Sequence, residues 1–178
     1  MDLSRVQAAE ELTTAGPVSI DEVITTSLEA HVVQAESAEV ELVRAGQRSA
    51  QVVGDVQMLT EAVSNLIANA IAYSPVGAHV GVGVRTIDGI VEIAVTDQGI
   101  GIAEADQQRI FERFYRADQA RSRRTGGTGL GLAIVKHVAQ RHDGEVRVWS
   151  QPGRGSTFTL RIPEGGPATP PQNRSNLS

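Results

Sequence analysis

The run of glycines and threonines from Thr125 to Gly131, followed directly by an apolar helical pattern, constrains this chain more than any other feature. Glycine lets a backbone approach a ligand closely and adopt a positive φ. The first turn of the helix that follows has unpaired N–H groups at the positive end of the helix dipole. Together these features predict an anion site, most often a phosphate site. The run alone is equally compatible with a flexible loop that caps a helix.

The composition excludes several classes of function. With 40% hydrophobic residues but only three Phe, two Tyr and one Trp in 178 residues, the chain predicts one domain with an aliphatic core. A net charge of −5 argues against a general nucleic-acid binder. The absence of cysteine excludes disulfides, thiolate zinc sites and a cysteine nucleophile. No apolar run approaches the roughly 20 residues that span a membrane, so no direct membrane contact is expected.

A helix with a polar stripe is predicted upstream, from Asp55 as its N-cap to about Ala72. Glu61, Asn65 and Asn69 are spaced by four residues and therefore share one face. Asparagine is a mediocre helix former because its side chain competes for backbone hydrogen bonds. Its amide oxygen is a hard, neutral ligand that suits Mg²⁺. The alternative is a solvated polar stripe without a ligand.

A hairpin follows, predicted from two alternating stretches at 80–85 and 90–96. The second strand ends in Asp97, with Gly99 and Gly101 behind it. A carboxylate only accepts hydrogen bonds, so it would suit an amine donor such as the exocyclic amine of adenine. The alternative is a turn in which the aspartate caps a short helix, predicted at 104–110.

Arginines gather between this hairpin and the glycine run. Five arginines lie between positions 113 and 124, directly after the aromatic residues of segment 111–115. In an acidic protein this local excess predicts an anion clamp. A solvated basic loop is the alternative.

The other predicted elements carry no chemistry. They are a strand at 18–20, a helix at 21–35 capped by Ser19, two strands at 40–43 and 49–53, a helix at 130–142, and strands at 145–150 and 156–162. His31 is expected at the edge of an apolar face. His137 and His142 are expected at the surface or at the C-terminal end of their helix, and neither is expected to be catalytic.

Taken together, four motifs occur in a defined order: Asn65-x-x-x-Asn69, Asp97-x-Gly99-x-Gly101, the segment 111–116, and Gly127-x-Gly129-x-Gly131. In this order they resemble the catalytic ATP-binding domain of a bacterial sensor histidine kinase, a fold shared with gyrase and Hsp90. The stretches 69–75 and 126–137 are similar to phosphate-responsive two-component kinases of actinobacteria. The resemblance covers about residues 17–163. It implies an α/β (α+β) two-layer sandwich, with a mixed, mostly antiparallel sheet of about five strands backed by three helices.

The resemblance also implies roles for individual residues. Asn69 would bind Mg²⁺, Asn65 would contact phosphate or a metal-bound water, and Arg116 would reach the phosphates, so Asn65 and Arg116 are the candidate catalytic residues. Asp97 would accept from adenine N6, and Tyr73 would line the pocket. The other expected ATP-binding residues belong to the glycine motifs: Gly99, Gly101, Gly127, Thr128, Gly129, Leu130 and Gly131. The aromatic rings of Phe111 and Phe114 would anchor a lid over the nucleotide.

Two departures from the family pattern affect the expected activity. Ala72 stands where many relatives carry a basic residue, so one phosphate contact is missing or comes from the lid arginines. The phosphoacceptor segment, a histidine followed by an acidic residue, is absent. The chain is therefore expected to be a fragment: residues 1–16 a remnant of a dimerisation helix or linker, 17–163 the catalytic domain, and 164–178 a disordered tail.

Partners follow from the same resemblance. They are ATP, a His-containing dimerisation domain of the same kinase, and a cognate response regulator, with no nucleic acid. The parent protein is expected to be a homodimer anchored in the cell membrane. This domain is expected to lie in the cytoplasm and to be monomeric when isolated.

Several alternatives remain. A gyrase- or Hsp90-type hydrolase is disfavoured because its glutamate base would stand where this chain has Asn65, and Glu61 is one turn too early. A serine protein kinase of the anti-sigma-factor type and a non-catalytic docking module stay open. A P-loop enzyme is excluded, since the only lysine, Lys136, has no Gly-Lys-Ser/Thr context. No Rossmann fingerprint has its third glycine or alanine at the right spacing.

Overall fold

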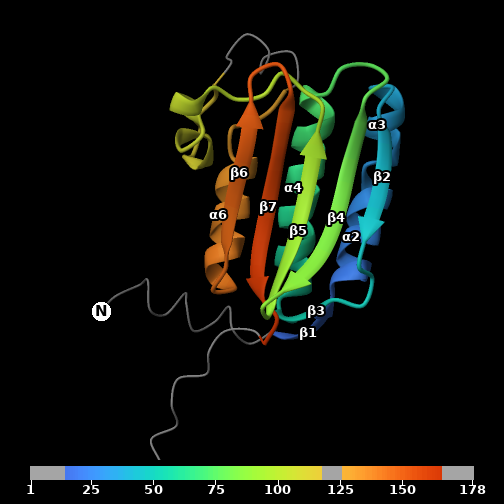
Figure 1. Ribbon diagram of the computed structural model, residues 1–178, viewed down its shortest axis with the longest axis vertical. Helices are drawn as coiled ribbons and strands as arrows, with labels where there is room; N and C mark the ends of the chain where they lie inside the picture. The colour runs from blue at the N-terminus through green and yellow to red at the C-terminus, as the bar shows by residue number, and fades with distance from the viewer. Residues whose placement is uncertain (1–14, 118–125, 166–178) are drawn as a thin grey trace, which may run out of the picture.

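The computed structural model describes residues 15–117 and 126–165. A five-stranded sheet forms one layer, in the order β2-β4-β5-β7-β6, and helices cover one of its faces (Figure 1). The strands are β2 (Glu41–Gly46), β4 (His79–Ile87), β5 (Ile90–Asp97), β6 (Glu145–Gln151) and β7 (Gly155–Pro163). The β2 strand runs parallel to β4, and the other neighbours are antiparallel. The predicted two-layer sandwich with a mixed, mostly antiparallel sheet is confirmed.

The helical layer holds four α-helices in the described residues, one more than predicted. They are α2 (Ile20–Ala30), α3 (Val32–Ser37), α4 (Val56–Tyr73) and α6 (Gly131–Arg141). Two 3₁₀ turns, η2 (Glu104–Asp106) and η3 (Arg109–Phe111), replace the short helix predicted at 104–110. A separate two-stranded sheet pairs β1 (Gly16–Ser19) with β3 (Gln51–Gly54). None of the helices in the described part is long and apolar enough to cross a membrane.

The core forms between α4 and the covered face of the sheet. Alternate residues of the central strands are fully buried there: Val80, Val82, Val91, Ile93, Val95, Leu160 and Ile162. The β4–β5 turn is as predicted, because Asp88 and Gly89 both adopt the positive φ, 51° and 74°, that a two-residue hairpin turn of this type requires. The α4 N-cap is also as predicted, since the Asp55 carboxylate accepts from the N–H groups of Gln57 and Met58 at 2.8 and 3.0 Å.

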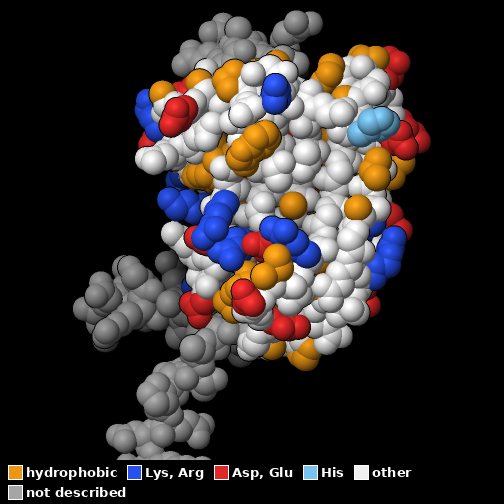
Figure 2. Space-filling model, viewed as in Figure 1, with side chains coloured by type: hydrophobic (Ala, Val, Ile, Leu, Met, Phe, Trp, Pro, Cys, Tyr) orange, Lys and Arg blue, Asp and Glu red, His pale blue; other side chains and the backbone are white. Residues whose placement is uncertain are grey.

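The uncovered face of the sheet carries a row of alternating charges. Four residues stand directly opposite one another on neighbouring strands: Arg85, Glu92, Arg161 and Glu145. Charged side chains of both signs gather over the middle of this face (Figure 2). Arg85 Nε and Arg161 Nε donate to the two oxygens of Glu92 at 2.6 and 2.9 Å. These bonds, that from Arg85 first, hold the pKa of Glu92 below its usual value.

One local prediction is wrong. The helix predicted at 21–35 ends at Ala30, because His31 leaves the helical region at φ −112° and its Nδ1 lies 2.7 Å from the Ser27 carbonyl oxygen. The strands predicted at 40–43 and 49–53 form as β2 and β3, and they pair with β4 and β1. At Gly46, with φ 83°, the chain passes so close to β4 that an added Cβ would lie 2.3 Å from the Val84 oxygen.

Candidate functional site

A cavity of about 300 Å³ lies at the end of the sandwich where β5 ends and α6 begins. Most of the predicted binding residues line it: Asn65, Asn69, Tyr73, Asp97, Gly101, Arg116, Gly127, Thr128, Gly129 and Gly131. Two predicted residues, Gly99 and Leu130, are absent from its lining. Leu130 is instead the N-cap of α6. At Gly99, an added Cβ would lie 2.5 Å from the Tyr73 carbonyl oxygen, so its role is to let two backbones pass closely.

Asp97 offers one carboxylate oxygen to the cavity. The residue is only 7% exposed at the end of β5. Its Oδ1 accepts from the backbone N–H groups of Gly99 at 2.8 Å and Ser156 at 3.3 Å. Burial raises the pKa of the Asp97 carboxyl, and these two bonds oppose part of that shift. Because both bonds go to Oδ1, Oδ2 keeps its capacity to accept from a ligand.

The polar stripe of α4 faces the same cavity. Asn65 Nδ2 donates to the Glu61 carbonyl oxygen at 3.0 Å, which leaves Oδ1 as the outward atom. This oxygen points toward the start of α6, where a Cβ added to Gly131 would lie 3.1 Å from it. Asn69 lines the cavity one turn further along α4. Glu61 does not line the cavity.

The donor set fits only one class of metal. In residues 15–117 and 126–165, no group of three or more His, Cys, Asp or Glu side chains could hold an ion. A cation here would rely on the amide oxygens of Asn65 and Asn69, with waters and ligand oxygens completing its shell. Mg²⁺ accepts that arrangement, since it keeps several waters and shares phosphate oxygens with a nucleotide. The residues present therefore fit Mg²⁺ brought in with a phosphate ligand.

The glycine run opens the first turn of α6 toward the cavity. The helix begins at Gly131 without a side-chain cap hydrogen bond, so its first N–H groups stay available to a ligand. Gly129 adopts φ 73°, and an added Cβ would lie 2.9 Å from the Phe114 Cα atom. The Phe114 N–H also donates to the Gly129 carbonyl oxygen at 2.8 Å. The backbone of the aromatic segment thus holds the end of the glycine run in place.

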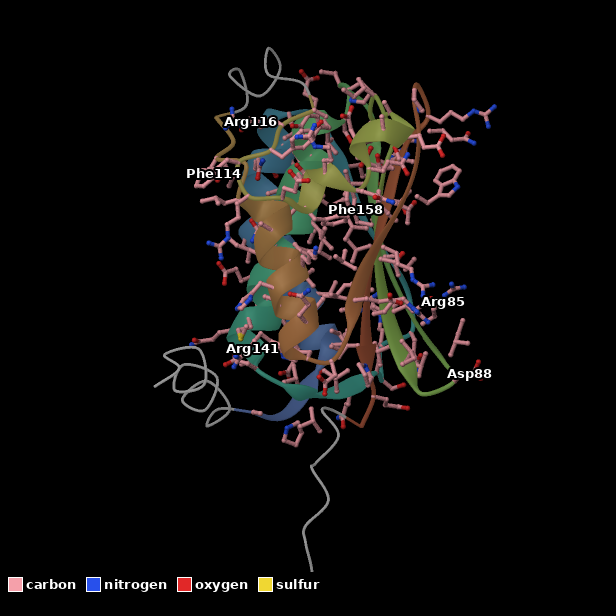
Figure 3. The ribbon with its side chains drawn as sticks, turned by 90° about the vertical axis from the view of Figure 1, so that its left-hand side faces the viewer. Arg85, Asp88, Phe114, Arg116, Arg141 and Phe158 are labelled. Carbon is pink, nitrogen blue, oxygen red and sulfur yellow. The ribbon has the colours of Figure 1, made fainter. Side chains whose placement is uncertain are left out.

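The aromatic segment only partly follows the prediction. Phe111 packs edge-on against Phe158, with ring centroids 6.2 Å apart, and joins the core. Phe114 is 70% exposed at φ 64°, and its ring lies on the outside of the molecule, whereas Phe158 lies between helices and sheet (Figure 3). The expected anchoring by the Phe114 ring is therefore wrong, because its backbone makes the contact instead. The arginines at 121, 123 and 124 lie outside the described residues.

Several lining residues were missed by sequence reasoning. Five are apolar and two are polar: Ile100, Ile102, Ile110, Leu132, Phe158, Gln34 and Tyr115. The alternation of β7 could have found Phe158, since it places that residue on the covered face with Leu160 and Ile162. Nothing in the sequence around Gln34 distinguishes it from other polar residues of its helix.

His142 lies at the C-terminal end of α6, as expected, but it is buried at 3% exposure. Its Nε2 accepts from the Asp55 N–H at 3.0 Å, so its proton is on Nδ1, which donates to the Val138 carbonyl oxygen at 2.8 Å. The imidazole therefore joins the end of α6 to the N-cap of α4. Of the two expected positions, the C-terminal end of the helix is observed and the surface is not.

Comparison with known proteins gives a consistent result. Residues 54–166 match the profile of the family described as "Histidine kinase-, DNA gyrase B-, and HSP90-like ATPase". Over 164 residues the chain is 52% identical to the sensor-like histidine kinase SenX3 of Mycolicibacterium smegmatis, covering 92% of this chain and 43% of SenX3. The chain thus spans less than half the length of that relative. The mycobacterial match agrees with the resemblance to actinobacterial kinases.

Two solved structures are also similar. The mycobacterial sensor histidine kinase MprB superposes with a TM-score of 0.73 at 37% identity, covering 85% of this chain and 99% of that structure. Full-length ShkA in complex with AMPPNP superposes with a TM-score of 0.75 at 28% identity, covering 88% of this chain and 32% of ShkA.

Proposed function

Because this chain belongs to the histidine kinase-, DNA gyrase B- and HSP90-like ATPase family, we propose that it is the ATP- and Mg²⁺-binding catalytic domain of a sensor histidine kinase. The observation that carries the proposal is the convergence of Asp97, Asn69 and the first turn of α6 on one cavity. The similarity to ShkA, whose structure is a complex with AMPPNP, supports it. The proposed domain is the segment 17–163.

The cavity offers each part of ATP a suitable surface. Adenine would lie against apolar side chains such as Ile102 and Phe158, with its N6 amine donating to Asp97 Oδ2. Tyr73 would close one side of the cavity. The triphosphate would extend toward Thr128 and the segment 127–131, where the open N–H groups at the start of α6 accept negative charge.

Positioning and charge neutralisation are what phosphoryl transfer requires most from a protein. We assign Asn69, assisted by Asn65, to the metal side of the phosphates, where Mg²⁺ supplies charge neutralisation when bound. Arg116 lies at the same cavity and would carry positive charge to the terminal phosphates. These groups orient the phosphate chain, but none of them is an acceptor for the transferred group.

The acceptor must come from outside the residues of this site. His142 is buried with both ring nitrogens bonded, and His31 Nδ1 is close to the Ser27 carbonyl oxygen. We therefore propose that the γ-phosphoryl group passes to a histidine on a separate dimerisation domain, for relay to an aspartate of a response regulator. The parent protein would be a membrane-anchored homodimer with this domain on the cytoplasmic side.

A phosphotransfer assay tests the proposal. With γ-labelled ATP and Mg²⁺, the chain alone should incorporate negligible label. Adding a His-bearing helical dimerisation domain should give acid-labile label on that domain. Strong labelling of the chain alone would contradict the proposal.

The same assay separates the alternatives. Acid-stable label on a partner serine would favour the anti-sigma-type kinase. Steady release of inorganic phosphate would favour a gyrase-type hydrolase. Absence of nucleotide binding would favour the docking module.

A further inference from the structure

Four polar residues between the end of β5 and position 117 are spaced by three positions: Asp106, Arg109, Glu112 and Tyr115. Asp106 ends η2 and Arg109 begins η3. Side-chain contacts bring Asp106, Arg109 and Glu112 together around Tyr115. We call these four residues the Asp106 cluster.

Three side-chain contacts hold the Asp106 cluster together. The Tyr115 hydroxyl donates to Asp106 Oδ1, and this bond is the main reason that the pKa of the Tyr115 phenol is raised. The guanidinium carbon of Arg109 lies 4.3 Å from the centroid of the Tyr115 ring, within cation–π distance. Arg109 Nε also lies 3.7 Å from Glu112 Oε1. Tyr115 is thus held at its hydroxyl and on one ring face.

The backbone on either side of Tyr115 is fixed as well. The Tyr115 N–H donates to the Glu112 carbonyl oxygen at 3.3 Å, and the preceding residue, Phe114, donates to Gly129 at 2.8 Å. Tyr115 and Arg116 both line the cavity, whereas Asp106 and Arg109 do not. The Asp106 cluster therefore holds Tyr115 from outside the cavity, and Arg116, the next residue in the chain, faces the cavity.

An arginine side chain loses considerable rotamer freedom when it is ordered against a ligand. That cost falls when its backbone is already fixed where the ligand needs it. We propose that Tyr115 is a positioning residue: Asp106 and Arg109 hold its ring, and Tyr115 in turn holds Arg116 at the phosphate end of the cavity. The inference rests on the proposed ATP site and deepens it. It makes the Asp106 cluster a determinant of selectivity for ATP over nucleotides with fewer phosphates.

The main test uses Asp106→Ala, because Asp106 does not line the cavity and its side chain accepts the hydrogen bond from Tyr115. Calorimetric titrations with ATP, ADP and adenosine, all with Mg²⁺, compare it with wild type and with Glu104→Ala in the same 3₁₀ turn. We expect the Kd for ATP to rise about three- to tenfold in Asp106→Ala, the effect of one side-chain hydrogen bond. Adenosine affinity should stay unchanged, ADP should show a smaller loss than ATP, and Glu104→Ala should match wild type.

A double-mutant cycle tests whether the effect passes through Arg116. Tyr115→Phe, which keeps the ring beneath Arg109, should weaken ATP binding in the wild-type background and add nothing in Arg116→Ala. Any one of three results would overturn the inference. They are equal losses of affinity for ATP, ADP and adenosine, unchanged ATP affinity in both Asp106→Ala and Tyr115→Phe, and additive losses in the cycle. If the wild-type protein binds no ATP, the proposed function itself fails. If it binds ATP and the variants give one of the results above, only the inference about Tyr115 fails.

Discussion

Asp97→Asn isolates the adenine contact with the least disturbance to the fold. The two side chains have nearly the same shape, so the substitution leaves no cavity. An asparagine Oδ1 can keep both backbone hydrogen bonds, from Gly99 at 2.8 Å and Ser156 at 3.3 Å. The second oxygen then becomes an NH₂ group, and a donor faces the donor of adenine N6. The contact with adenine N6 therefore changes from attractive to repulsive, whereas the two backbone hydrogen bonds are kept.

The magnitude follows from that exchange. Loss of one hydrogen bond with a buried polar partner costs about 1–3 kcal/mol, which is a rise of roughly 5- to 150-fold in Kd. The affinity for ATP should fall in Asp97→Asn, but the stability of the ligand-free protein should not. Burial raises the pKa of Asp97, so its ionised form opposes folding of the ligand-free protein. The wild type should therefore lose stability as pH rises through this raised pKa, and the asparagine variant should not.

Two measurements check this reasoning. Calorimetric titration with ATP should show the loss of affinity, and titration with inorganic triphosphate, which lacks adenine, should show none. Urea unfolding without ligand should give an asparagine variant at least as stable as wild type near neutral pH, with the two converging below the ordinary aspartate pKa of about 3.9. Unchanged ATP affinity would refute the assignment of Asp97 to adenine. A marked loss of stability at neutral pH would refute the account of its burial.

Three further substitutions test the parts around the cavity. Gly129→Ala should cost about 1–2 kcal/mol of stability in urea unfolding and should weaken ATP binding in a calorimetric titration. The reason is that alanine is strained at φ 73° and its Cβ would lie 2.9 Å from the Phe114 Cα atom. His142→Phe should lower the unfolding free energy by about 1–3 kcal/mol, since the Asp55 N–H loses its acceptor. Ile93→Ala should cost about 2–5 kcal/mol in the same assay while leaving the Kd for ATP unchanged, because its side chain is fully buried away from the cavity.

Sequence reasoning succeeded where the determining interactions are local. The Asp55 cap lies within three residues of the N–H groups that it accepts from, and the β4–β5 turn depends on two adjacent residues with positive φ. The glycine run and the asparagine stripe were also found by spacing alone. Their meeting in one cavity was an implication of the resemblance, since no local pattern states which elements become neighbours.

The predictions that were wrong or missing depend on contacts distant in sequence. His142 is buried because it meets the N-cap of α4, 87 residues away in the chain. The partner of β2 was not predicted: it pairs with β4, and no periodicity in the sequence records that choice. The resemblance implied that the Phe114 ring anchors a lid, yet the residue has a positive φ, its N–H bonds to Gly129, and its ring lies outward. In each case tertiary context decided between locally equivalent options.

The small β1–β3 sheet lies at the end of the molecule opposite the cavity (Figure 1). Between the two ends runs α4, whose 18 residues give it a length of about 27 Å. The β1 strand, four residues long and paired only with β3 in the described part, thus lies about one α4 length from the cavity. A rotation of about 10° about β1 would sweep the cavity through about 5 Å, an arm length set by α4.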